Sequence, residues 1–183
     1  MKIGIFYGSS TGNTQTAAEL IAENLSEHEC ILKDVDGIDV EEFLGYDLLL
    51  LGISTWYVGE PQDDWIDILD DMDGQDFSGV KFAIFGQGDQ LGYPDTFQDG
   101  MGMVYEKMMN GGGTGKIGFT STDDYDFDES KGVIDGMFCG LSLDEDNQGE
   151  MTDERVDRLY RIGVFAAVVA IVLLLIRRKK NSN

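Results

Sequence analysis

The sequence predicts an α/β protein with a doubly wound, parallel sheet that helices cover on both faces. Short apolar runs alternate with helix-like patterns along the chain, which is the rhythm of βαβ units. Two of these runs, residues 48–53 and 82–85, are continuously apolar, as is typical of buried central strands. Ligands of such sheets bind beyond the carboxyl ends of the strands, so we expect a site in the loops that follow them.

We expect one domain in residues 1–160 and a separate tail in residues 161–183. The strands are predicted at residues 2–7, 30–34, 47–53, 81–86 and 116–119. The helices are predicted at residues 13–25, 63–69, 97–109 and from residue 152 onward. Residues 120–136 form an acidic loop with aromatic side chains, and extended structure resumes at residues 137–143. We interpret this loop as an insertion into an edge strand, because loops of this length are usually functional or disordered.

The loop after the first strand is predicted to bind a phosphate group. Its side chains offer hydroxyl and amide groups, and its glycines allow a close backbone approach. The polar residues and glycines are Gly8, Ser9, Ser10, Thr11, Gly12, Asn13 and Thr14. No Lys or Arg lies in the loop, and its spacing matches neither a Walker loop nor a GxGxxG fingerprint. We therefore expect a phosphate monoester held by neutral donors, and an ordinary polar turn with a helix cap is the alternative.

Two further loops each carry an aromatic residue among glycines. Trp56 follows the third strand, and Tyr93 lies in the loop after the fourth. Both loops are expected at the same sheet edge as the phosphate loop, where the two side chains are placed to enclose a flat ring. Simple packing is the alternative for either residue alone.

Charge divides the chain into an acidic body and a basic end. Residues 1–154 hold six Lys, no Arg and 34 acidic residues, a net charge of −28, whereas residues 155–183 carry +6. Such a body excludes nucleic acid as a partner and favours basic proteins. Solubility in a salty environment explains the acidic surface equally well.

Metal and thiol chemistry are not expected. Cys30 and Cys139 stand apart, and His28 is the only histidine. Unpaired thiols suit a reducing compartment, and we see no leader-like segment before the first strand. We therefore expect a cytoplasmic domain, and no general base or nucleophile pattern accompanies the predicted loops.

These motifs together resemble the long-chain flavodoxins, which carry single electrons on FMN. The resemblance runs from Met1 to about Arg158, and the loop of about twenty residues is the mark of the long-chain branch. The matching segments are residues 5–14, 55–60, 88–93, 97–99, 121–128 and 143–148. The resemblance implies a five-stranded sheet in the order 2-1-3-4-5 and an electron carrier that is not an enzyme. Its implied partners are a low-potential donor, such as photosystem I or a pyruvate-type oxidoreductase, and ferredoxin–NADP reductase.

The resemblance also implies contacts with FMN. Ser9, Ser10, Thr11, Gly12, Asn13 and Thr14 would hold the phosphate, Trp56 and Tyr93 would flank the ring, and Gly88 and Asp89 would contact its pyrimidine edge. A backbone carbonyl in the loop Tyr57, Val58, Gly59 would turn toward flavin N5. Thr55 and Asp146 are implied near the ribityl chain, and Gln98 completes the set. The rival hypotheses are a flavodoxin-like NAD(P)H:quinone reductase and a flavin-free docking module.

The tail is predicted to anchor the protein in a membrane. Residues 162–176 are uncharged and apolar, which corresponds to roughly 22 Å of helix against a hydrocarbon core of about 30 Å. The apolar segment becomes just long enough to cross a bilayer if it is counted from Leu159 and the side chains of Arg161 and Arg177 extend to the membrane surface. We expect a single-pass apolar helix with the flavin domain in the cytoplasm. Burial of this helix in a soluble protein is the alternative.

Overall fold

The computed structural model describes residues 1–115 and 117–159. Its main sheet has the strand order β2-β1-β3-β5-β8, in which every neighbouring pair is parallel. These strands are β1 (Lys2–Tyr7), β2 (Glu29–Asp34), β3 (Leu48–Trp56), β5 (Phe82–Gln87) and β8 (Leu141–Leu143). With β8 as the fifth strand, the predicted order 2-1-3-4-5 is confirmed.

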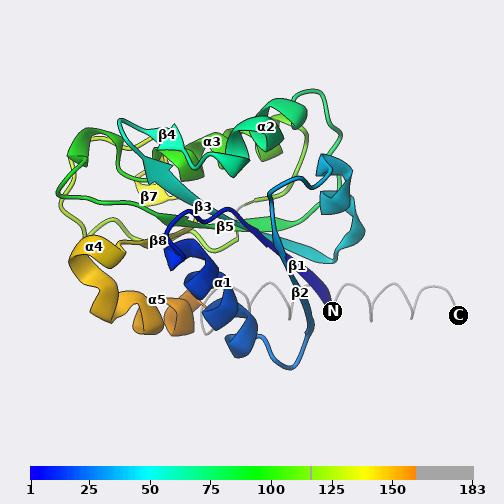
Figure 1. Ribbon diagram of the computed structural model, residues 1–183, viewed down its shortest axis with the longest axis horizontal. Coiled ribbons are helices and arrows are strands. Elements are labelled where there is room, and N and C mark those ends of the chain that lie inside the picture. Colours follow the sequence, from blue (N-terminus) through cyan, green and yellow to red (C-terminus); the bar gives the residue numbers. More distant parts are fainter. Residues whose placement is uncertain (116, 160–183) are drawn as a thin grey trace, which may run out of the picture.

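Helices cover both faces of the sheet (Figure 1). The helices α1 (Asn13–Asn24) and α5 (Thr152–Leu159) lie on one face, and α2 (Asp64–Asp71) and α3 (Asp99–Asn110) lie on the other. Alternate side chains of β3 enter the two cores, because successive residues of a strand point to opposite faces. Leu48 and Leu50 pack toward α1, whereas Leu49, Leu51 and Ile53 pack toward α2 and α3. The apolar run in the sequence thus reflects a strand buried on both faces.

The fifth strand does not lie at the predicted residues. Residues 117–119 are not a strand, and one isolated parallel bridge, from Thr114 to Lys81, lies just before them. The edge strand continues at β8, which pairs with the carboxyl end of β5. The insertion therefore splits the edge strand, so the short apolar run at residues 117–119 was mistaken for its main part.

The insertion folds back on the body around aromatic residues. It contains a small hairpin of β6 (Val133–Ile134) and β7 (Met137–Phe138). Phe97 packs against Tyr125 and Phe127, with ring centroids 5.5 Å away in each case. The Tyr125 hydroxyl donates to Ser142 O in β8, and the guanidinium of Arg155 lies 4.3 Å from the Tyr125 ring centroid. The insertion is therefore an ordered part of the domain.

Shorter elements complete the described chain. They are β4 (Glu60–Pro61), α4 (Glu145–Gln148) and the 3₁₀ helices η1 (Val40–Gly45), η2 (Pro94–Thr96) and η3 (Gly149–Met151). The predicted apolar helix at residues 162–176 lies outside the described residues. Within residues 1–115 and 117–159, no helix combines the length and apolar character needed to cross a bilayer.

Candidate functional site

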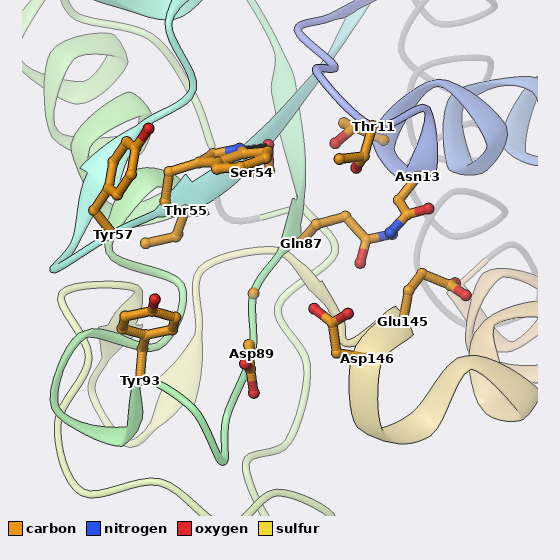
Figure 2. Close-up of a pocket in the computed structure, with 13 residues that line it drawn as sticks. Thr11, Asn13, Ser54, Thr55, Tyr57, Gln87, Asp89, Tyr93, Glu145 and Asp146 are labelled. Atoms are coloured by element: carbon orange, nitrogen blue, oxygen red, sulfur yellow. Dashed lines mark hydrogen bonds between the residues drawn. The ribbon is translucent and has the colours of Figure 1, made fainter.

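A cavity opens at the carboxyl edge of the sheet, beside the ends of β3 and β5 and the loop after β1 (Figure 2). Its volume is about 480 Å³, which lies within the range of small-molecule sites. The strand order reverses at this edge, between β1 and β3. The lining residues are Thr11, Asn13, Thr14, Ser54, Thr55, Trp56, Tyr57, Gln87, Gly88, Asp89, Tyr93, Glu145 and Asp146.

The loop between β1 and α1 forms one side of the cavity. Gly12 has φ +91°, a left-handed conformation that glycine adopts without strain, and α1 begins at the next residue. The Ser9 hydroxyl accepts hydrogen bonds from Gly12 N at 3.1 Å and Gln15 N at 3.3 Å. The first turn of α1 contains no acidic residue. The helix therefore offers the positive end of its dipole to an anion.

Gly8 allows this loop to start close to the core. A Cβ atom at Gly8 would lie 2.1 Å from Gln62 Oε1 and 2.7 Å from Trp65 Cδ1. Trp65 is fully buried, and its indole N–H donates to Gly52 O at 2.8 Å, so its ring has no room to move away. Gln62 Nε2 donates to Ser10 Oγ at 3.3 Å, which ties the loop to the residues before α2. Any larger residue at position 8 would displace the loop.

Aromatic side chains form the opposite side of the cavity. In Figure 2, Tyr57 and Tyr93 lie on one side, and Thr11 and Asn13 lie on the other. The Trp56 indole N–H donates to Ser54 Oγ at 2.9 Å, which fixes the ring at the end of β3. Tyr57 and Tyr93 are 60% and 46% exposed, so the rings also face solvent. The cavity thus joins a polar end, at the start of α1, to an aromatic end.

The loop after β3 has an unusual backbone. Tyr57 has φ +47° and Gly59 has φ +88°, so a non-glycine residue occupies the left-handed region in a sharp turn. The Thr55 hydroxyl accepts from Gly100 N at 3.0 Å, which joins the start of this loop to α3. Under the loop, the buried Asp99 carboxylate binds the Lys131 ammonium at 2.9 Å. The turn is therefore held from below by α3 and by the insertion.

A hydrogen-bond network fixes the loop after β5. Asp89 Oδ1 accepts from Leu91 N at 3.2 Å, Gly92 N at 2.7 Å and Asn147 Nδ2 at 2.9 Å. Burial raises the pKa of Asp89, but these hydrogen bonds outweigh burial and hold the pKa below its ordinary value. Asn147 Nδ2 also donates to the buried Asp144 at 3.0 Å. The network fastens this loop to α4 and keeps Asp89 ionised.

The charged groups that line the cavity are acidic. They are Asp89, Glu145 and Asp146, and the lining residues include no Lys or Arg. Partial burial, with the charges of Asp89 and Asp144, raises the pKa of Asp146. Within the described chain, no group of three or more His, Cys, Asp or Glu side chains is arranged to hold a metal ion. An anion at this site would be bound by neutral donors and the α1 dipole.

The structure brings ten of the predicted site residues to the cavity. These are Thr11, Asn13, Thr14, Thr55, Trp56, Tyr57, Gly88, Asp89, Tyr93 and Asp146. The predicted residues outside its lining are Ser9, Ser10, Gly12, Val58, Gly59 and Gln98. Gln98 differs most from its predicted role in cofactor binding. Its side chain is fully buried, and Nε2 donates to Ser142 Oγ at 3.0 Å and to Leu143 O at 2.9 Å.

Three lining residues are not among the predicted site residues. Ser54 and Gln87 lie at or near the ends of β3 and β5, and Glu145 begins α4. Ser54 and Gln87 could have been predicted from their positions near the carboxyl ends of central parallel strands, where ligands bind. The prediction ended the fourth strand at residue 86, one residue before Gln87.

Comparisons with known proteins agree with this architecture. The family model for flavodoxin matches residues 5–158. A flavodoxin of Synechocystis sp. is 51% identical over 156 residues, covering 85% of this chain and 91% of the relative, and one of Nostoc sp. is 44% identical over 155 residues, with the same coverage. The crystal structure of Fusobacterium nucleatum flavodoxin bound to flavin mononucleotide superposes with a TM-score of 0.82 at 31% identity, covering 87% of this chain and 95% of that one. The chain therefore belongs to the flavodoxin family.

Proposed function

We propose that this protein is an FMN-dependent, low-potential one-electron carrier. The observation that carries the proposal is a cavity with the polar loop before α1 at one end and Trp56 and Tyr93 at the other, in a chain of the flavodoxin family. Flavodoxins are electron-transfer flavoproteins and not enzymes. FMN supplies the one-electron chemistry when it is bound, and the chain binds, orients and electrostatically tunes it.

Residues in the cavity lining and next to it suit the successive parts of FMN. The loop residues Ser9 to Thr14 and the start of α1 would hold the phosphate, and Trp56 and Tyr93 would flank the ring. Gly88 and Asp89 would contact the pyrimidine edge, with Asp89 held in place by Asn147. Thr55 and Asp146 would lie along the ribityl chain. A backbone carbonyl in the turn at Tyr57–Gly59 would accept a hydrogen bond from flavin N5, and Gly59 gives this turn its freedom.

The charge of the domain favours a low reduction potential. Reduction adds negative charge to a site that already contains Asp89, Glu145 and Asp146. One like charge about 8 Å away costs roughly 2 kcal/mol at an effective dielectric constant near 20. Several such charges lower a one-electron potential by roughly a hundred millivolts or more.

Purification and a spectroscopic redox titration test the carrier hypothesis. We expect a yellow protein, or an apoprotein that FMN reconstitutes, with two separate one-electron steps at low potential. A colourless protein that FMN fails to reconstitute would contradict the proposal. Unaided oxidation of NADPH would identify a quinone reductase instead.

We infer that the partners are basic redox proteins, namely a low-potential donor and a reductase such as ferredoxin–NADP reductase. Support comes from the charge of −28 on residues 1–154 and from the exposed rings of Tyr57 and Tyr93 at the cavity mouth. Electrostatic steering predicts an association rate that falls steeply as salt rises. A salt-independent rate in stopped-flow mixing with the reductase would contradict this inference.

We also propose that residues 161–183 tether the flavin domain to a membrane, with the domain on the cytoplasmic side. Support comes from the sequence, in which the apolar residues 162–176 are followed by Arg177, Arg178, Lys179 and Lys180. The full-length protein should sediment with membranes and a chain that ends at Arg161 should not. Recovery of both in the soluble fraction would leave a soluble cytoplasmic carrier.

A further inference from the structure

Gln87 lines the cavity but is not among the residues proposed to contact FMN. As the last residue of β5, it pairs with Ser54 of β3 on one side and Leu143 of β8 on the other. Its backbone is therefore fixed near the middle of the sheet edge. Its side chain is only 5% exposed and lines the cavity. In Figure 2 it extends toward Asn13 and lies between the side that carries Tyr93 and the phosphate loop.

The Gln87 amide is an unused hydrogen-bond donor. Among the described residues, four buried side-chain atoms have no hydrogen-bond partner, and Gln87 Nε2 is the one whose residue lines the cavity. A buried N–H group that has lost its bonds to water and gained none is unfavourable. Such groups are rare in native proteins and call for an explanation. A ligand in the cavity that accepts a hydrogen bond provides one.

The neighbours of Gln87 identify the chemistry of that acceptor. The carboxylates of Glu145 and Asp146 line the same side of the cavity (Figure 2). A phosphate placed beside them would be repelled, and the loop at Asn13 already offers it neutral donors. A hydroxyl group accepts from the amide and can donate to a carboxylate. The combination of one amide donor and two carboxylate acceptors therefore suits a polyhydroxyl chain.

We propose that Gln87 Nε2 donates a hydrogen bond to a hydroxyl group of the ribityl chain of FMN. This inference rests on the proposed function, since it requires FMN in the cavity. It makes Gln87 a residue that selects flavins with a polyhydroxyl chain. The middle of the cofactor would thus be held by a donor on a central strand, between the loop that would hold the phosphate and the loops that carry Trp56 and Tyr93.

Three flavins and one variant test the proposal. Gln87→Met keeps the length of the side chain and removes both N–H groups. Dissociation constants are measured for FMN, for riboflavin, which lacks the phosphate, and for lumiflavin, which lacks the ribityl chain. We expect the variant to bind FMN and riboflavin more weakly by the same factor, roughly three- to tenfold, and lumiflavin equally well. The free energy of unfolding of the apoprotein should not fall, because the variant removes an unpaired donor.

Any other pattern of dissociation constants would contradict the proposal. Equal weakening for all three flavins, with a less stable apoprotein, would mean that Gln87 only packs the sheet edge. Weakening for FMN alone would make the phosphate its acceptor, and no change would mean no contact. Failure of the wild-type protein to bind any flavin would instead reject the proposed function.

Gln75→Met provides a matched control. Gln75 lies in the turn after α2, which leads to the amino end of β5 and thus to the opposite edge of the sheet. The substitution is chemically the same, and the residue does not line the cavity. We expect all three dissociation constants to match those of the wild type.

Discussion

Cys30 and Cys139 differ in their surroundings and therefore in reactivity. Cys139 is fully buried, and burial raises the pKa of its thiol to about 12. Cys30 is only partly buried, in β2, and burial also raises its pKa. Because the thiolate is the reacting form, we expect maleimide at pH 8 to label Cys30 in the folded protein and Cys139 only after unfolding. Mass spectrometry of the labelled peptides checks this, and equal labelling rates before denaturation would contradict it.

Asp146 is expected to destabilise the apoprotein at neutral pH. Partial burial and the charges of Asp89 and Asp144 raise its pKa. Between the ordinary carboxyl pKa, about 3.9, and the raised value, the folded chain binds more protons than the unfolded chain. Stability therefore falls as pH rises through this window, and the loss persists at pH 7. Asp146→Asn should raise the free energy of unfolding at pH 7 by less than about 1 kcal/mol, since solvent still reaches this partly buried side chain and screens its charge.

Urea unfolding of the apoprotein at a series of pH values measures this effect. The difference between Asp146→Asn and the wild type should shrink as pH falls, because the wild-type carboxyl then becomes neutral. A gain that is the same at every pH would show that charge is not its cause.

The sequence places single residues at the cavity best where residue type and loop position agree. Thr11, Asn13 and Thr14 after β1 line the cavity as expected, as do Trp56 at the end of β3 and Tyr93 in the loop after β5. The direction of a side chain is harder to predict. Gln98 adopts φ +63°, and its amide turns inward to β5 and β8, away from the cavity. No local pattern in the sequence signals that turn.

At the scale of the elements, the turn after β3 should tolerate only glycine at position 59. A Cβ atom there would lie 2.8 Å from Asp99 Oδ2, and Asp99 is held by both the ammonium and the backbone N–H of Lys131. The left-handed φ adds a cost of about 1 kcal/mol for any other residue. We expect Gly59→Ala to lower the free energy of unfolding by about 2 kcal/mol or more.

Gly79→Ala separates the two contributions. Gly79 has φ +86°, close to the +88° of Gly59, but no atom lies within 4 Å of its Cβ position. This variant should lose only the conformational part, about 1 kcal/mol. Chemical denaturation of both variants measures the difference. If the two lose the same amount, the contact with Asp99 has no energetic weight.

The helices and the first four main strands were predicted within about three residues, because their apolar periodicity is strong. The fifth strand was misplaced, since its pairing is divided between the Thr114 bridge and three residues of β8. Fragments this short carry little periodic signal. Their place depends on pairing with β5, which is a property of the tertiary structure.

At the scale of the whole molecule, salt should stabilise the protein. Residues 1–154 carry a net charge of −28, and this charge opposes the compact state. The Debye length falls from about 30 Å at 10 mM salt to about 10 Å at 0.1 M, so the repulsion is screened early. We expect the free energy of unfolding in urea to rise with NaCl, mostly below 0.2 M. A rise that begins only at molar salt would indicate ion exclusion from the surface instead.

The two tryptophans give the protein two separate optical reporters. Trp65 is fully buried and its N–H donates to Gly52 O, so its surroundings change only when the core opens. Trp56 is held by Ser54 in the wall of the cavity, where a bound flavin would quench it by energy transfer. Loss of cofactor should therefore brighten the emission without shifting it to the red, whereas unfolding should do both. One emission spectrum would then distinguish an empty protein from a denatured one.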